Sequence, residues 1–173
     1  TREVAQNGRR GALMLSMDIA HPDVKEFITI KQDLQKVTGA NISIRLSDEF
    51  MNAVENNSEY THKWPIDSNT PKFTKTVNAK ELWDTIIECA HNTAEPGLIF
   101  WDRQHWYSTS SVYPGYKNTS TNPCSEIAMQ GGDSCRLIAM NLYNFVENPF
   151  TKDAKFLMED FYKATYELSL IHI

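Results

Sequence analysis

Strand-like and helix-like spacings of apolar residues alternate along the chain. Residues 11–19 are largely apolar and predict a buried strand. Ile42, Ile44 and Leu46 alternate with polar residues, as in a strand that buries one face. Further strands are predicted over residues 72–77, 98–102 and 137–145. The intervening segments 32–40, 55–71 and 104–121 are rich in polar or turn-forming residues and are predicted to be loops.

Helices are predicted where apolar residues recur every three or four positions. They begin at residues that suit a helix start, namely His21, Ser47, Asn78 and Thr151, and run to about residues 31, 56, 92 and 168. The side chains expected to face a core are Val24, Phe27, Ile28, Phe50, Met51, Val54, Leu82, Trp83, Ile86, Ile87 and Ala90. Because strands and helices alternate, the predicted fold class is α/β with crossover connections.

Composition narrows the possible functions. The 173 residues suit one modest domain or a piece of a larger protein, and 41% of them are hydrophobic, which is enough for a core. The net charge of −5 disfavours binding to nucleic acid, although a local basic pair can still bind a small phosphate. We expect neither a membrane span nor a signal peptide. Three cysteines do not make a disulfide scaffold, so we expect a reducing cytoplasm.

The segment Asn122-Pro123-Cys124-Ser125-Glu126 carries the most informative chemistry. Proline fixes its own φ and favours an extended conformation in the residue before it. If the segment is extended, Asn122, Cys124 and Glu126 share one face, because side chains two apart point the same way. An amide, a thiol and a carboxylate would then be neighbours. This grouping favours redox or radical chemistry on a polar small molecule, whereas the simpler alternative is a turn with a buried cysteine.

Other chemistry-bearing residues receive weaker assignments. Cys89 lies in a helical apolar pattern and is expected to pack in the core. The histidines lack the spacing of metal ligands, so no metal site is predicted. Arg9-Arg10 fits a phosphate contact and a solvated pair equally well. The aromatic run between Trp101 and Tyr116 is expected to pack rather than to stack on bases.

Residues 121–127 resemble the active-site finger of ribonucleotide reductase large subunits. Similar segments follow in the family's order at residues 8–12, 21–28, 38–43, 96–100 and 134–142. The resemblance implies a partial ten-stranded α/β barrel with the finger loop at its centre, and it identifies residues 1–167 as an internal fragment of the catalytic barrel domain. Residues 168–173 depart from the family and are expected to be a non-native tail derived from a sequencing adapter.

The resemblance also implies a separate role for each residue of the finger. Cys124 would carry a thiyl radical that removes the 3′ hydrogen of the ribose. Glu126 would take the proton of the 3′ hydroxyl, and Asn122 would hold the ribose hydroxyls in place. Cys135 would be one member of the dithiol that supplies two electrons, and the other member would lie upstream of this chain.

The first polar loop resembles the segment that senses an effector nucleotide in this family. Gln35, Lys36, Gly39 and Asn41 are its candidate effector or substrate contacts, and Lys31 is a further one. An ordinary polar connection between a helix and a strand fits the composition equally well.

The family resemblance implies specific partners. They are a ribonucleotide substrate, taken as a diphosphate, a dNTP or ATP effector, a thioredoxin- or glutaredoxin-type reductant, and a second copy in a full-length homodimer. The sequence around Cys124 is most similar to class II enzymes, whose cofactor is adenosylcobalamin. The alternative is a class I large subunit that receives its radical from a separate metal-containing subunit. A non-catalytic nucleotide-binding regulatory module and a thiol–disulfide protein using Cys124 and Cys135 are the other hypotheses.

Overall fold

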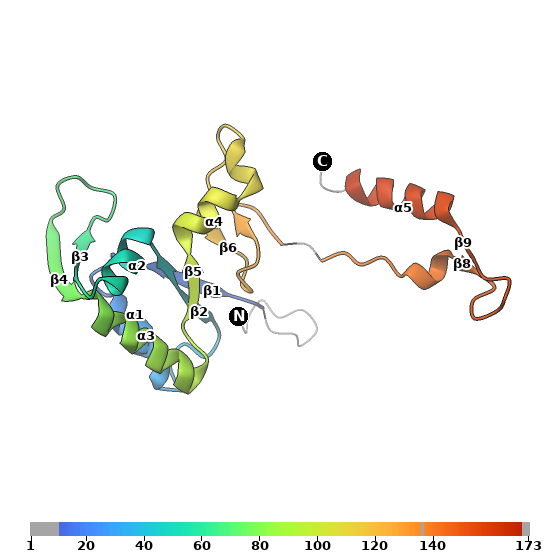
Figure 1. Cartoon of the computed structure of the whole chain (residues 1–173). Helices are drawn as coiled ribbons and strands as arrows, with labels where there is room; N and C mark the ends of the chain where they lie inside the picture. The colour runs from blue at the N-terminus through green and yellow to red at the C-terminus, as the bar shows by residue number, and fades with distance from the viewer. Residues whose placement is uncertain (1–10, 136, 171–173) are drawn as a thin grey trace. The chain divides into compact units, whose positions relative to one another are not determined.

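The computed structural model describes residues 11–135 and 137–170, which belong to two compact units divided after Cys135. The first unit combines a parallel sheet with helices and two hairpins, and the second is built around one helix (Figure 1). This arrangement confirms the predicted α/β class. The sheets in the described part of the chain are small and open, and none of them closes into a barrel.

The main sheet consists of three parallel strands in the order β1 (Met14–Asp18), β2 (Asn41–Leu46) and β5 (Gly97–Phe100). Ile44 of β2 pairs with Met17 on one side and with Leu98 on the other. β2 is therefore central and is covered on both faces, as is usual for parallel strands, whereas alternation predicted one buried face. The strand predicted over residues 11–19 is confirmed as β1, but it lies at an edge and is only partly buried rather than buried.

Three helices follow the strands, namely α1 (Val24–Thr29), α2 (Asp48–Glu55) and α3 (Ala79–Thr93), and the 3₁₀ turn η1 (Ile30–Gln32) extends α1. Both predicted asparagine or serine caps are confirmed. Ser47 Oγ accepts a hydrogen bond from the N–H of Phe50, and Asn78 Oδ1 accepts one from the N–H of Glu81. These bonds satisfy amides that have no partner inside the helix, which is why the starts of α2 and α3 are readable from sequence.

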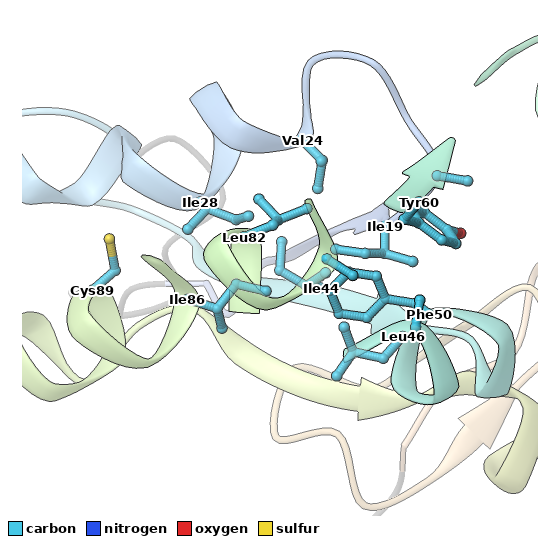
Figure 2. Close-up of a cluster of buried hydrophobic side chains, with 13 residues drawn as sticks. Ile19, Val24, Ile28, Ile44, Leu46, Phe50, Tyr60, Leu82, Ile86 and Cys89 are labelled. Atoms are coloured by element: carbon cyan, nitrogen blue, oxygen red, sulfur yellow. The ribbon is translucent and has the colours of Figure 1, made fainter. Parts of the chain in front are cut away.

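A hydrophobic core joins the helices to one face of the sheet (Figure 2). Ile44 and Leu46 enter it from β2, Phe50 from α2 and Ile86 from α3, and all four are almost completely buried. Burial of a side chain of this size stabilises the fold by roughly 1.5–3 kcal/mol. The prediction that Ile87 faces the core is wrong, because this residue lies on the exposed side of α3.

The antiparallel hairpin of β3 (Glu59–Trp64) and β4 (Phe73–Asn78) leads directly into α3. The strand predicted over residues 72–77 is confirmed, but the loop predicted over 55–71 contains β3. Tyr60 and His62 are buried on one face of β3, while Glu59 and Thr61 are exposed. The alternation is hidden in the sequence because one of its buried positions is a histidine.

We expect His62 to make the first unit less stable below neutral pH. Its side chain is 2% exposed, and burial, aided by the charge of Lys75, lowers its pKa from 6.5. The imidazole of the unfolded chain binds a proton near pH 6.5, whereas the buried imidazole of the folded chain stays neutral to a lower pH. The stability of the first unit is therefore complete above pH 6.5 and is lost as the pH falls toward the folded pKa. Urea unfolding between about pH 8 and 5 should show the loss. His62→Gln should reduce the pH dependence, and an unchanged dependence would contradict the assignment.

Beyond β5 the chain forms α4 (Trp101–Tyr107), the 3₁₀ turn η2 (Thr109–Val112), β6 (Ser120–Thr121) and β7 (Ala128–Met129). The strand predicted over 98–102 therefore ends earlier, and the loop predicted over 104–121 starts inside a helix. Trp101 packs under the guanidinium of Arg45, whose central carbon lies 5.2 Å from the ring centroid. Trp106, by contrast, is 81% exposed, so the expected packing of the aromatic run is not general.

The second unit contains the 3₁₀ turn η3 (Leu142–Phe145), β8 (Val146–Glu147), β9 (Lys155–Phe156) and helix α5 (Met158–Leu170). The strand predicted over 137–145 is wrong, and Thr151 lies in a turn rather than at the start of the last helix. Phe145, Phe156 and Phe161 pack together, with ring centroids 5.4 to 6.4 Å apart. Neither α5 nor any other helix in the described residues is long and apolar enough to cross a membrane.

Candidate active site

The segment that carries Cys124 is the loop of the β6–β7 hairpin, so the extended geometry that a shared face requires is not formed. The simpler alternative of a turn is confirmed, except that its cysteine is exposed rather than buried. The N–H of Asn122 donates to the carbonyl of Ile127 over 3.1 Å, and the N–H of Ser125 donates to the carbonyl of Asn122 over 2.9 Å. Ser125 has a φ of 71°, in the left-handed region that side-chain-bearing residues seldom adopt. The chain therefore turns back within six residues, so the candidate side chains do not share one face of a strand.

Asn122 holds this loop closed from the inside. The residue is 2% exposed, and its Oδ1 accepts a hydrogen bond of 3.0 Å from the N–H of Ile127. Thr121 is also buried, and its hydroxyl donates to the carbonyl of Asn122. An asparagine side chain that bonds nearby backbone is a common way to stabilise a turn. The structure therefore gives Asn122 a structural role that sequence reasoning did not assign.

The two reactive side chains of the loop are accessible to solvent. Cys124 and Glu126 are exposed, and Cys135, six residues beyond β7, is half-buried. All three cysteines of the chain are free thiols, including Cys89, which is buried in the core as predicted. Burial raises the pKa of the Cys89 thiol, which makes it a poor nucleophile. An exposed thiol and an exposed carboxylate on one short loop can both approach the same small molecule.

Asn118 supports the base of the hairpin and was missed by sequence reasoning. It is buried, and its Oδ1 accepts a hydrogen bond of 3.1 Å from the hydroxyl of Ser110 in η2. The adjacent Thr119 donates its N–H to the carbonyl of Met129 in β7. Asn118 lies in a polar run from Lys117 to Thr121, and such runs usually indicate solvent exposure rather than burial, so the sequence did not mark it as a buried residue.

The candidate effector contacts fall into two groups. Gln35 and Lys36 are exposed, and the ammonium of Lys36 lies 3.7 Å from Asp33. Gly39 and Asn41 instead line a separate cavity of about 230 Å³. Lys31 also lines this cavity, where its ammonium donates to the carbonyl of Ala40 and pairs with Glu95. The second group is therefore associated with a space that can hold a ligand.

Within residues 11–135 and 137–170, no three His, Cys, Asp or Glu side chains are grouped closely enough to hold a metal ion. Arg9 and Arg10, considered for phosphate binding, lie outside the described residues.

Known proteins are similar to almost the whole of this chain. Residues 2–170 match the protein family described as "Ribonucleotide reductase, barrel domain". A vitamin B12-dependent ribonucleoside-diphosphate reductase of Thermoplasma acidophilum is 36% identical over 168 residues, which cover 95% of this chain and 21% of the relative. An enzyme of the same name from Mycobacterium tuberculosis is 35% identical over 136 residues, covering 78% of this chain and 19% of that protein.

A vitamin B12-dependent ribonucleotide reductase of Rhodopirellula baltica is 31% identical over 163 residues, covering 80% of this chain and 15% of the relative. The chain thus spans about a fifth or less of the length of these relatives. The family match extends across both units, from the parallel sheet through the Cys124 hairpin to α5. This chain therefore belongs to the ribonucleotide reductase barrel-domain family.

Proposed function

We propose that the protein containing this chain reduces ribonucleotides to 2′-deoxyribonucleotides by a radical mechanism centred on Cys124. The observation that carries the proposal is the β6–β7 loop, which presents a thiol and a carboxylate to solvent from a turn closed by Asn122. The family match supplies the reaction class. The sheet β1–β2–β5 would form part of a ten-stranded barrel around this loop.

Each side chain of the loop has a distinct task in this proposal. Cys124 as a thiyl radical takes the 3′ hydrogen atom of the ribose, forming the S–H bond and leaving a radical on the sugar. Glu126 accepts the proton of the 3′ hydroxyl, and the 2′ hydroxyl leaves as water after taking a proton from the dithiol that includes Cys135. Asn122 orients the ribose through its amide nitrogen, because its oxygen is already bonded to Ile127.

Cys135 supplies part of the reducing power. Replacing the 2′ hydroxyl by hydrogen needs two electrons, which a dithiol provides as it becomes a disulfide. Cys135 is a free, half-buried thiol and would be one member of that dithiol. A thioredoxin- or glutaredoxin-type protein would then reduce the disulfide by thiol exchange, which is consistent with a reducing cytoplasm.

The radical has to reach Cys124 from outside this chain. The exposed thiol on a short loop fits a group that receives a radical from a neighbouring molecule. The relatives are named vitamin B12-dependent, which supports adenosylcobalamin as the cofactor, and when bound this group would supply such a radical. None of the described residues is assigned to hold it. Gly39 and Asn41, with Lys31, would contact the effector or the substrate in a full-length homodimer.

The proposed function is tested by assaying the complete protein with and without adenosylcobalamin. We expect deoxynucleotide formation from ribonucleoside diphosphates only when the cofactor and a dithiol reductant are both present. Ribonucleoside triphosphates serve as the parallel substrate, because faster reduction of them would overturn the diphosphate assignment. Activity that needs a separate metal-containing subunit instead of the cofactor would place the protein in class I. Absence of reduction under every condition would contradict the function itself.

A further inference from the structure

The β6–β7 hairpin that carries Cys124 is too short to fix its own position. Its ladder pairs Ser120 with Met129 and Thr121 with Ala128. The chain reaches the hairpin from η2 through a segment that forms neither helix nor strand. An isolated two-stranded hairpin is marginally stable at best in water. The position of Cys124 therefore depends on contacts between the hairpin and the rest of the first unit.

A buried side-chain contact joins the base of this hairpin to η2. The hydroxyl of Ser110 donates to Oδ1 of Asn118 over 3.1 Å, and Asn118 is 4% exposed. The amide nitrogen of Asn118 is also enclosed and has no hydrogen-bond partner within residues 11–135 and 137–170. Without the Ser110 hydroxyl, the buried amide oxygen would lose its donor, which is unfavourable. The adjacent Thr119 donates its N–H to the carbonyl of Met129, so a displaced Asn118 would displace the hairpin as well.

Ser110 is connected in turn to the end of α4. Its Oγ lies 2.9 Å from that of Ser108, the residue that follows α4. A hydroxyl carries a single proton, and that of Ser110 goes to Asn118, so Ser108 is the donor in this contact. The two serines and Asn118 thus form a hydrogen-bonded chain that runs from α4 to the hairpin.

α4 is held against both the main sheet and α2. It follows β5 directly, and its first residue, Trp101, packs under the guanidinium of Arg45 in β2. Asp102 Oδ2 accepts a hydrogen bond of 2.7 Å from the N–H of Asp48, the first residue of α2. The hydrogen-bonded chain therefore links the Cys124 hairpin to the parallel sheet.

We propose that Asn118 is a positioning residue for Cys124, and that it acts by fixing the base of the hairpin to η2 through Ser110. This inference rests on the proposed radical function. The sulfur must meet the 3′ hydrogen of the ribose in one geometry, and a misplacement of about 1 Å can lower a rate about a hundredfold. Nucleotide contacts outside the hairpin would be unchanged, so loosening the hairpin should lower kcat more than it raises KM.

The proposal is tested with variants of Ser110 in the complete protein. Ser110→Ala should lower kcat about tenfold and change KM less than about twofold, whereas Ser110→Thr keeps the hydroxyl and should restore kcat. Asn118→Ala should cause the same loss, and the double variant should lose no more than either single one, because all of them break the same bond. Ser111→Ala is the matched control and should leave kcat unchanged, because this hydroxyl of the same turn bonds the carbonyls of His105 and Ser108 instead of Asn118.

Hydrogen exchange of the backbone reports on the hairpin without any turnover. The N–H groups of Thr119 and Asn122, both bonded within the hairpin, should exchange about tenfold faster in Ser110→Ala, since a buried oxygen loses its donor, and at the original rate in Ser111→Ala. Absence of ribonucleotide reduction by the unaltered protein would contradict the proposed function, and the exchange rates would still decide whether Asn118 anchors the hairpin.

Three outcomes would overturn the positioning role. The first is a Ser110→Ala variant that keeps its kcat, or that changes KM alone. The second is failure of Ser110→Thr to restore the rate that Ser110→Ala loses. The third is equal hydrogen exchange of the hairpin in Ser110→Ala and Ser111→Ala.

Discussion

Replacing Cys124 by serine in the complete protein is expected to abolish ribonucleotide reduction while leaving nucleotide binding intact. The O–H bond of serine is stronger than the S–H bond of cysteine, so a serine cannot exchange a hydrogen atom with ribose. Loss of a residue that reacts directly with substrate should lower the rate at least about a thousandfold. Cys124 is exposed on a turn, so the variant should fold normally. Initial rates and equilibrium dialysis of nucleotide measure the two effects, and retained turnover would exclude the thiyl assignment.

Cys135→Ser is the matched control, because it makes the same chemical exchange at a different thiol. This variant should lose repeated turnover with dithiol reductants but still remove the 3′ hydrogen of bound substrate. Release of label from 3′-tritiated substrate distinguishes the two variants, since only Cys124→Ser should prevent it. Normal cycling of Cys135→Ser would remove that residue from the redox dithiol.

Phe50→Ala is expected to lower the free energy of unfolding of the first unit by roughly 3–5 kcal/mol, because truncating a buried aromatic leaves a cavity. The ring is 0% exposed and meets Tyr60 edge-on, with centroids 5.2 Å apart. Because the truncation removes contacts with both the sheet and the β3–β4 hairpin, it should destabilise the whole core. Urea unfolding of the 173-residue chain, followed by far-ultraviolet circular dichroism, measures it.

Phe73→Ala provides the comparison for the core variant. Phe73 begins β4 and is 48% exposed, so the same truncation removes little buried surface. It should cost less than about 1 kcal/mol. If Phe50→Ala and Phe73→Ala reduced stability equally, the cluster in Figure 2 would not be the main core of the first unit.

Sequence reasoning succeeded where a local interaction decides the structure. Ser47 and Asn78 mark the starts of α2 and α3 because an N-cap bonds a backbone amide only two or three residues away. It failed where a partner strand distant in the sequence decides whether a strand forms. Leu137 begins an apolar stretch that resembles a strand, but the stretch has no neighbouring strand in the described residues, and this side chain is 93% exposed. A strand forms only when its backbone groups find a pairing edge.

In the candidate site, too, the sequence predicts the chemistry of the residues but not the backbone geometry that places them. The sequence identified Cys124 and Glu126 by their chemistry, and the structure places both on one exposed loop. It offered a turn only as the simpler alternative, because the residue order does not show that the N–H of Ile127 bonds Asn122 or that Ser125 adopts a left-handed φ. Which backbone amide bonds an asparagine side chain depends on which of several nearby amides is free, and the residue order alone does not reveal this.

The placement of β2 between β1 and β5 has a consequence for how the chain folds during synthesis. Ser43 of β2 pairs with Ser16 on one side and with Gly97 on the other, so its second neighbour is synthesised only after α2, the β3–β4 hairpin and α3. Contacts between such distant residues form slowly, because a long loop must close first. Until β5 arrives, one edge of an apolar strand stays open, and chaperone binding at that stage would protect the nascent protein from aggregation.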